Sequence, residues 1–196
     1  NSELLDYDKK QVKEHVEKFS PIDVIFFDAF ETEPIVQYVH ALDPNIVVTR
    51  GEMETPEQNI PNAALPGPWE TCMTMGTQWQ YKPTNETYKS GTELIEKLVE
   101  IRAKGGNFLM NIGPKPNGEI PIEQEERLRE IGLWMFVNNE SIKNVRPVPT
   151  SIKDGDMWFT KDKDDNTAYV LISGQKDWFK GFRRSFLLKN MKATKN

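Results

Sequence analysis

The feature that most constrains this fold is the run DVIFFD at residues 23–28, in which four apolar residues end on a single carboxylate. A short continuous apolar run of this kind predicts a fully buried strand of a parallel sheet. Asp28 then stands where the strand leaves the sheet, and catalytic groups gather at the carboxyl ends of parallel strands. We therefore expect Asp28 to be a nucleophile, a base or a metal ligand, with capping of the next element as the structural alternative.

Helical and strand patterns alternate along the first three quarters of the chain, which favours parallel strands with helices packed outside them. Beyond Pro147, short β-rich runs at 157–159, 167–172 and 182–188 are separated by turn clusters, and they predict an antiparallel β domain. The expected helices cover residues 7–19, 33–42, 90–104 and 121–138, and the expected strands cover 23–28, 46–49, 69–75 and 107–112. The proline-rich residues 52–67 are expected to form a loop.

This alternation supplies about four strand–helix units before residue 146, whereas an eight-fold barrel needs about 250 residues. A half barrel would leave unpaired strand edges and an uncovered interior, which proteins avoid. We therefore expect an α/β fold that is the second half of a TIM-like barrel, within a larger protein. On this hypothesis the chain is inactive alone, and the N-terminal half of the barrel is needed in cis or in trans. A small open α/β sheet of four strands is the alternative.

Composition narrows the classes of partner. The formal net charge of −5 and the pI near 5.2 argue against a nucleic-acid surface and give no support for a basic membrane patch. No apolar run approaches the roughly 20 residues needed to span a bilayer, and no signal peptide is seen. With Cys72 as the only cysteine and two histidines, disulfides within the chain and cysteine-rich zinc sites are excluded. We expect no cofactor and no metal.

Three blocks of sequence carry a family resemblance. They read TPEQ at residues 55–58, PWETCMTMG at 68–76 and KGGNFLMNIGP at 104–114. Together they resemble the α-L-fucosidases of glycoside hydrolase family 29, and the resemblance covers roughly residues 5 to 149. The pairing of the second and third blocks at this spacing is specific, whereas either block alone would be weak.

The resemblance implies a retaining exo-glycosidase that removes terminal α-L-fucose from glycans by double displacement. It implies an irregular (β/α) barrel, here residues 1–146, followed by a β-sandwich that begins at 147–196. Asp28 matches the family nucleophile and Glu57 the acid/base. Arg50 would contact the sugar, and Phe26, where the family usually has Trp, would line the fucose pocket. Family habit suggests an exported enzyme, periplasmic or extracellular, or lysosomal in a eukaryote.

Other assignments stay open. Trp79 could stack on the C–H face of a sugar or could belong to the core beneath the loops. Glu52, Glu54 and Glu70 are alternatives to Glu57 as the acid/base. A non-catalytic protein that binds fucose or another carbohydrate on a degenerate barrel is the alternative function. An aspartate-nucleophile phosphatase is a further alternative, but it would need a second Asp two residues after Asp28, and Phe30 stands there.

Overall fold

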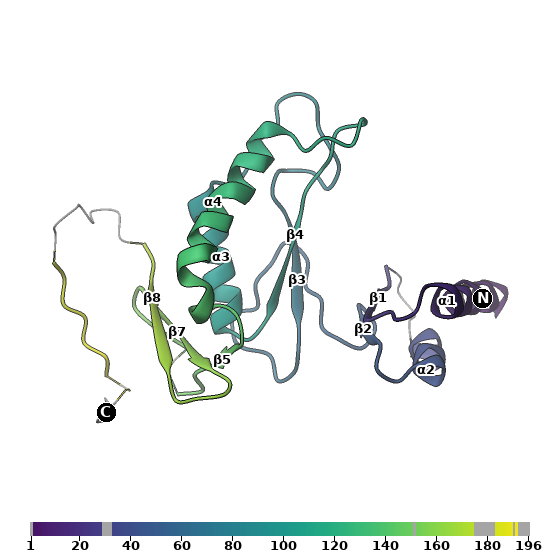
Figure 1. Ribbon diagram of the computed structural model, residues 1–196, viewed down its shortest axis with the longest axis horizontal. Coiled ribbons are helices and arrows are strands. Elements are labelled where there is room, and N and C mark those ends of the chain that lie inside the picture. The colour runs from purple at the N-terminus through teal and green to yellow at the C-terminus, as the bar shows by residue number, and fades with distance from the viewer. Residues whose placement is uncertain (1, 29–32, 151, 175–182, 190, 192–196) are drawn as a thin grey trace.

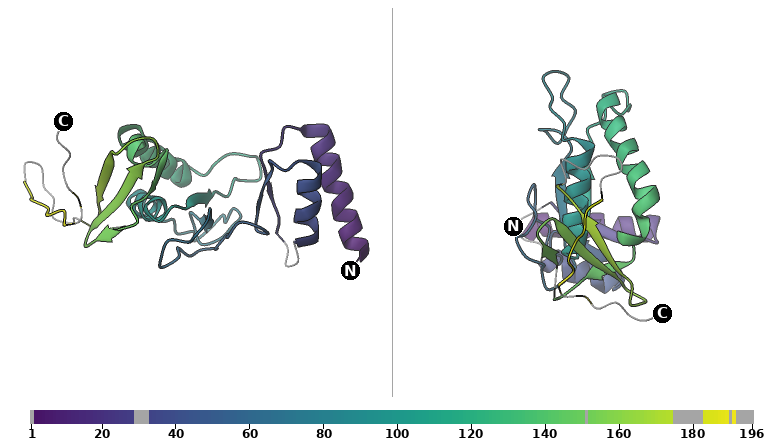
Figure 2. Two further views of the ribbon diagram at one scale, coloured as in Figure 1. Left: turned by 90° about the horizontal axis from the view of Figure 1, so that it is seen from below. Right: turned by 90° about the vertical axis from the view of Figure 1, so that its left-hand side faces the viewer.

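The computed structural model describes residues 2–28, 33–150, 152–174, 183–189 and 191. These residues form an elongated arrangement of three parts (Figures 1 and 2). An N-terminal part holds two helices and two strands, a central part holds two more of each, and an antiparallel sheet follows. The parallel βα units and the antiparallel sheet predicted from the sequence are both present.

The N-terminal part is built from α1 (Ser2–Phe19), β1 (Val24–Phe26), α2 (Glu33–Leu42) and β2 (Val47–Thr49). The two strands pair in parallel, with Val24 opposite Val47 and Phe26 opposite Thr49. α1 and α2 pack against each other on one side of the strands (Figure 2). The core between them consists of Val12, Ile35, Val36, Val39, Ile46 and Val48.

The central part pairs β3 (Glu70–Thr74) in parallel with β4 (Asn107–Asn111), and α3 (Gly91–Ala103) and α4 (Ile122–Asn138) accompany them. α3 begins where the Ser90 hydroxyl accepts a hydrogen bond from the Glu93 amide at 3.1 Å, as the capping pattern predicts. It ends before Gly105, whose φ of +87° lies in the left-handed region that favours glycine.

Residues 53–57 form a short extended segment that joins the two parallel pairs, and we call it the linking segment. Isolated bridges place Met53 beside Thr49, Glu54 beside Trp69 and Glu57 beside Cys72, all in parallel. The expectation of a loop throughout 52–67 is therefore wrong at its start. Prolines such as Pro56 remove backbone donors and hide the strand period in the sequence.

The antiparallel sheet contains β5 (Val145–Pro147), β6 (Lys153–Asp154), β7 (Met157–Asp162) and β8 (Ala168–Ile172), with β7 pairing to the other three. A 3-10 turn, η1 (Asn139–Ser141), leads into it. Trp158 and Leu171 pack with Val99 and Ala103 of α3, so the sheet and the helix share one core. The expected boundary after residue 146 falls inside β5.

The expected strand at 182–188 is not found where it can be assessed. Residue 182 lies outside the described residues, and residues 183–188 are not in a strand. A β-rich sequence becomes a strand only when it joins a ladder of strands, and a local pattern does not show whether such a ladder forms. The pattern therefore predicted the propensity but not the pairing.

Two apolar faces remain open, and one of them corrects the expectation of a fully buried first strand. Val24, Phe26 and Val47 are exposed, because the helices cover only one face of β1 and β2. On α4, Leu133, Phe136 and Val137 are 73%, 87% and 80% exposed.

Within the described residues, no helix is long and apolar enough to cross a membrane.

Candidate active site

Arg50, directly after β2, is the centre of a small polar group. Its Nη1 donates a hydrogen bond to Asp28 Oδ1, and its Nη2 donates to Glu57 Oε1. The guanidinium carbon also lies 5.4 Å from the centre of the Phe26 ring. Exposure of the side chains is 22% for Arg50, 81% for Asp28 and 46% for Glu57. The Arg50 guanidinium thus contacts three of the other four side chains predicted from the sequence.

The parallel pairing of β1 with β2 explains why Asp28 and Arg50 meet. Phe26 pairs with Thr49, and the Phe27 amide donates to the Thr49 carbonyl at 3.3 Å. The two strands therefore end at the same edge, and the residues just beyond them share it. Arg50 has a φ of +56°, a conformation that side-chain-bearing residues adopt infrequently and that is often found at functional sites.

Glu57 belongs to the linking segment, whose backbone is hydrogen-bonded to β3. The Gln58 amide donates to the Cys72 carbonyl at 2.8 Å, and the Cys72 amide donates to the Pro56 carbonyl at 3.1 Å. The Gln58 side-chain amide also donates to the Thr74 hydroxyl at 3.1 Å. Glu57 therefore has a fixed place opposite Cys72, and Gln58, which sequence reasoning missed, is one of the residues that fix it.

The charges around Arg50 perturb one another. Burial works to lower the pKa of Arg50, but its hydrogen bonds and charge interactions with Glu57 and Asp28 outweigh burial and raise it. Burial, with the charges of Glu57 and Glu70, raises the pKa of the Cys72 thiol. Burial also raises the pKa of Glu70. Burial is thus the main cause of the raised pKa values of Cys72 and Glu70.

The other acid/base candidates are distributed around this group. Glu52 turns toward α2, where its carboxylate lies 2.9 Å from His40 Nε2. Glu54 and Glu57 are three positions apart on an extended segment, so their side chains leave it on opposite faces. Glu70 and Cys72 are two positions apart on β3, so they point to the same face of the sheet. Glu57 pairs with Cys72 in parallel, so Glu57 shares that face. Of these carboxylates, Glu57 is the one that accepts a hydrogen bond from Arg50.

Trp79 lies apart from this group. Its ring is exposed in the irregular stretch between β3 and α3. In the described part of the chain, no hydrogen bond, ion pair or ring contact joins Trp79 to Arg50, Asp28 or Glu57. Its assignment to a sugar site stays a prediction.

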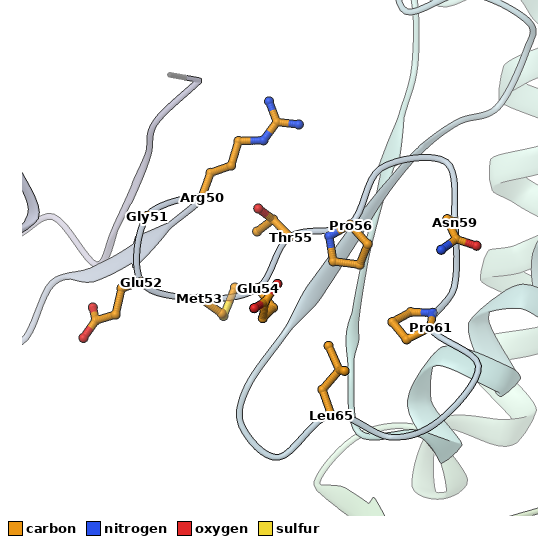
Figure 3. Close-up of a pocket in the computed structure, with 10 residues that line it drawn as sticks. All are labelled: Arg50, Gly51, Glu52, Met53, Glu54, Thr55, Pro56, Asn59, Pro61 and Leu65. Carbon is orange, nitrogen blue, oxygen red and sulfur yellow. The ribbon is translucent and has the colours of Figure 1, made fainter. Parts of the chain in front are cut away.

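A cavity of about 530 Å³ lies between Arg50 and the chain that follows it. Arg50, Glu54 and Asn59 contribute to its lining, whereas Asp28 and Glu57 do not. Figure 3 shows Arg50 and Glu52 pointing to opposite sides of the chain. The described residues contain no group of three or more His, Cys, Asp or Glu side chains placed to hold a metal ion.

Two carboxylates that share one guanidinium lie close together, and such a pair can serve nucleophilic and acid–base chemistry at a single atom of a ligand. The same geometry also occurs in structural ion networks. Exposure of Asp28 and Glu57 leaves both within reach of a ligand, because neither carboxylate is enclosed by the fold.

The sequence profile of the family described as Alpha-L-fucosidase matches residues 3–140. A plasma alpha-L-fucosidase of Rattus norvegicus is 38% identical over 117 residues, which are 57% of this chain and 26% of the relative. An alpha-L-fucosidase of Dictyostelium discoideum is 36% identical over 106 residues, which are 53% of this chain and 23% of that protein. The resemblance stated from the sequence is confirmed.

Solved structures agree. Alpha-L-fucosidase isoenzyme 1 from Paenibacillus thiaminolyticus superposes with a TM-score of 0.75 at 29% identity, over 82% of this chain and 45% of that one. An alpha-L-fucosidase from Bacteroides thetaiotaomicron, trapped as a covalent intermediate with 2-fluoro-fucosyl fluoride, gives 0.77 over 90% and 48%. At 20% identity the latter likeness shows the fold alone. The chain thus spans about a quarter of these curated relatives and under half of these solved chains.

Proposed function

The chain belongs to the α-L-fucosidase family, and we propose that it carries the two catalytic carboxylates of a retaining exo-glycosidase that hydrolyses terminal α-L-fucosyl residues. Asp28 is the nucleophile and Glu57 the acid/base. Arg50 and Phe26 contact the fucosyl ring, and Trp79 is a further sugar contact. The substrate is a fucosylated glycan or glycoconjugate.

The observation that carries this proposal is the shared contact of Asp28 and Glu57 with Arg50. A retaining glycosidase needs two carboxyl groups about 5 to 5.5 Å apart, on either side of the scissile bond. We propose that Asp28 and Glu57, which accept hydrogen bonds from the two terminal nitrogens of one guanidinium, have such a separation when a sugar is bound. Their backbone positions, at a strand end and on a paired segment, keep the separation fixed.

The reaction has two steps. In the first, Asp28 Oδ attacks the anomeric carbon, the bond to the glycosidic oxygen breaks, and the Glu57 proton passes to that oxygen. In the second, Glu57 takes a proton from water, the water oxygen attacks the anomeric carbon, and the ester bond to Asp28 breaks. Two inversions give net retention.

Arg50 changes partners during this cycle. An acid must hold a proton, but a hydrogen bond from a guanidinium favours the ionised form of Glu57. We propose that the entering sugar separates Arg50 from Glu57 and leaves its contact with Asp28 in place. Asp28 then stays ionised for attack, whereas Glu57 is desolvated by the sugar and takes up a proton.

The open apolar faces support a partner for this chain. Val24, Phe26 and Val47 are exposed on the uncovered face of β1 and β2, and Leu133 and Phe136 are exposed on α4. Exposed apolar patches of this kind mark surfaces that other protein segments cover. We propose that residues 1–146 form the second half of a (β/α) barrel whose first half is supplied in cis or in trans. Residues 147–196 then begin a β-sandwich.

Location is proposed on family grounds alone. An enzyme that trims fucosylated glycans meets its substrates outside the cytosol, so we propose an exported protein, periplasmic or extracellular, or lysosomal in a eukaryote. Fractionation of the source cells, with activity on an aryl fucoside followed in each fraction, tests this. Activity confined to the cytosolic fraction would contradict it.

One observation favours a second function, the binding of fucose without hydrolysis. Arg50 forms ion pairs with both Asp28 and Glu57. If the sugar does not displace Arg50, neither carboxylate is free to react, and the protein binds fucose without turnover. Calorimetric binding of fucose in the absence of hydrolysis would identify this alternative.

To test the proposed activity, the first half of the barrel of the Paenibacillus enzyme is fused to the N-terminus of this chain. We call the fusion protein the joined enzyme. Release of fucose from an aryl α-L-fucoside and from a fucosylated glycan is measured for the joined enzyme, for the chain alone and for the joined enzyme carrying Asp28→Asn. We expect turnover by the joined enzyme only. A folded joined enzyme that binds fucose but hydrolyses neither substrate would contradict the proposal.

A further inference from the structure

Lys104, just after the end of α3, holds one end of the stretch of chain that carries Glu57. Its side chain is only 8% exposed. The ammonium donates a hydrogen bond to the Pro61 carbonyl at 2.7 Å and another to Glu100 Oε1 at 2.6 Å. Pro61 follows the linking segment, so Lys104 fixes the chain on the C-terminal side of Glu57.

The backbone of Lys104 fixes the same stretch of chain on the N-terminal side of Glu57, near Glu54. Its carbonyl accepts a hydrogen bond from Trp69 Nε1 at 3.3 Å. Trp69 is fully buried and lies beside Glu54 in the parallel bridge, and the neighbouring Glu70 amide donates to the Glu54 carbonyl at 3.0 Å. The two anchor points, near Glu54 and at Pro61, therefore bracket Glu57.

The antiparallel sheet takes part in this arrangement. Lys104 Nζ lies 5.7 Å from the centre of the Trp158 ring of β7, and Lys153 Nζ lies 4.3 Å from the same centre. Trp158 is buried against α3. A single ammonium thus contacts α3 through Glu100, the chain after the linking segment through Pro61, and the antiparallel sheet through Trp158.

We infer that Lys104 is a positioning residue that sets the place of the Glu57 carboxylate; this rests on the proposed function of Glu57. A buried ammonium is tolerated only where its hydrogen bonds and charge partner are satisfied, so its location is narrowly fixed. Removing it leaves the Pro61 carbonyl and the Glu100 carboxylate without their partner and frees the chain beyond Gln58. Lys104 itself takes no part in bond making.

The first test needs no enzymatic activity. Amide hydrogen exchange is measured on the 196-residue chain with Lys104→Met, which keeps the length of the side chain but removes its donors. Lys97→Met is the matched control, because Lys97 is a partly buried lysine of α3 whose ion pair is with Glu93. We expect exchange of the Gln58 and Cys72 amides to become about tenfold faster in Lys104→Met alone.

The second test uses the joined enzyme and the leaving group. A dinitrophenolate departs without a proton, whereas a sugar alkoxide needs the proton of Glu57. In Lys104→Met we expect kcat/KM to fall about 10- to 100-fold for a fucosylated glycan and to change by less than about twofold for dinitrophenyl α-L-fucoside. Lys104→Arg, which can still donate to Pro61, is expected to recover most of the loss.

The outcomes distinguish a failure of the proposed function from a failure of the inference about Lys104. If the unsubstituted joined enzyme hydrolyses neither substrate, the proposed function fails, whatever the exchange experiment gives. If it hydrolyses both and Lys104→Met slows both equally, Lys104 is merely structural and the inference is overturned, as it is if neither rate changes. Should Lys104→Met not fold, Lys104→Arg decides, because any loss it causes must again be larger for the glycan.

Discussion

Asp28 and Glu57 accept hydrogen bonds from the two terminal nitrogens of one side chain, that of Arg50, although they come from different elements. Asp28 follows β1 and Glu57 lies on the linking segment, so the contact joins the N-terminal part of the molecule to the chain that leads into β3. If the two carboxylates have the different chemical roles assigned to them, removing each one should change the reaction in a different way.

Replacing Asp28 with glycine should reduce kcat/KM of the joined enzyme by roughly 10⁴-fold, because no covalent intermediate can form. The substitution leaves room for azide to attack the anomeric carbon in one step. A single displacement inverts the configuration, so the expected product is β-L-fucosyl azide, identified by its NMR coupling constant. Full activity in Asp28→Gly would remove Asp28 from the nucleophile role.

Replacing Glu57 with alanine should give a different product from the same reagent. Asp28 still forms the fucosyl ester from an activated aryl fucoside, and azide then opens that ester without needing a base. Two displacements retain the configuration, so α-L-fucosyl azide is expected, with kcat rising as azide is added. If Glu70→Ala responds to azide in this way and Glu57→Ala does not, Glu70 is the acid/base.

Packing at the Lys104-Gly105-Gly106 turn should be intolerant of even one methyl group. A Cβ on Gly106 would lie 2.4 Å from the Trp69 ring, which is fully buried. We expect Gly106→Ala to lower the free energy of unfolding by about 1 to 3 kcal/mol in chemical denaturation.

Gly132, on the exposed face of α4, provides the control for Gly106. A Cβ there would meet nothing within 4 Å. Gly132→Ala should therefore raise the free energy of unfolding by up to about 1 kcal/mol, since alanine is the better helix former. Equal effects of the two substitutions would show that the Trp69 contact does not constrain the turn.

Glu70 should make stability depend on pH. Burial raises its pKa above the ordinary value of 4.5, so between the two values the folded chain binds more protons than the unfolded one. Stability therefore falls as the pH rises through this window, and the full cost of the buried charge is present above it. Glu70→Gln should raise the melting temperature at neutral pH, and the gain should vanish as the pH falls below 4.5.

The exposed Glu54 on the linking segment supplies the control for this measurement. The Glu54 backbone is hydrogen-bonded to the Glu70 amide, but its side chain lies on the opposite face, so Glu54→Gln should leave the melting temperature nearly unchanged at every pH. A gain of equal size in both variants would mean that general charge repulsion, and not burial of Glu70, sets the dependence on pH.

Local patterns predicted most of the regular elements. The expected helix at 33–42 coincides with α2, and the predicted cap at Ser90 is present at the start of α3. The meeting of Asp28 with Arg50 could also be anticipated, because residues that follow neighbouring parallel strands share one edge. These features depend on short-range periodicity, capping and strand direction, all of which are visible in a sequence.

Features set by distant contacts could not be predicted. The contact of Lys104 with Pro61 joins residues far apart in the chain, and no local pattern announces it. The pairing of Glu57 with Cys72 was hidden by prolines that interrupt the strand period. The exposure of Val24 was missed because an apolar strand indicates a need for burial, whereas the covering layer decides whether burial occurs.

The most direct test of the central claim is to trap the covalent intermediate. The joined enzyme carrying Glu57→Gln is incubated with 2-fluoro-fucosyl fluoride, the reagent found in the trapped Bacteroides enzyme, then digested and analysed by mass spectrometry. We expect one fluorofucosyl group, esterified to Asp28. An adduct on any other carboxylate, or fucosyl turnover by the unsubstituted joined enzyme with no adduct on Asp28, would contradict the account.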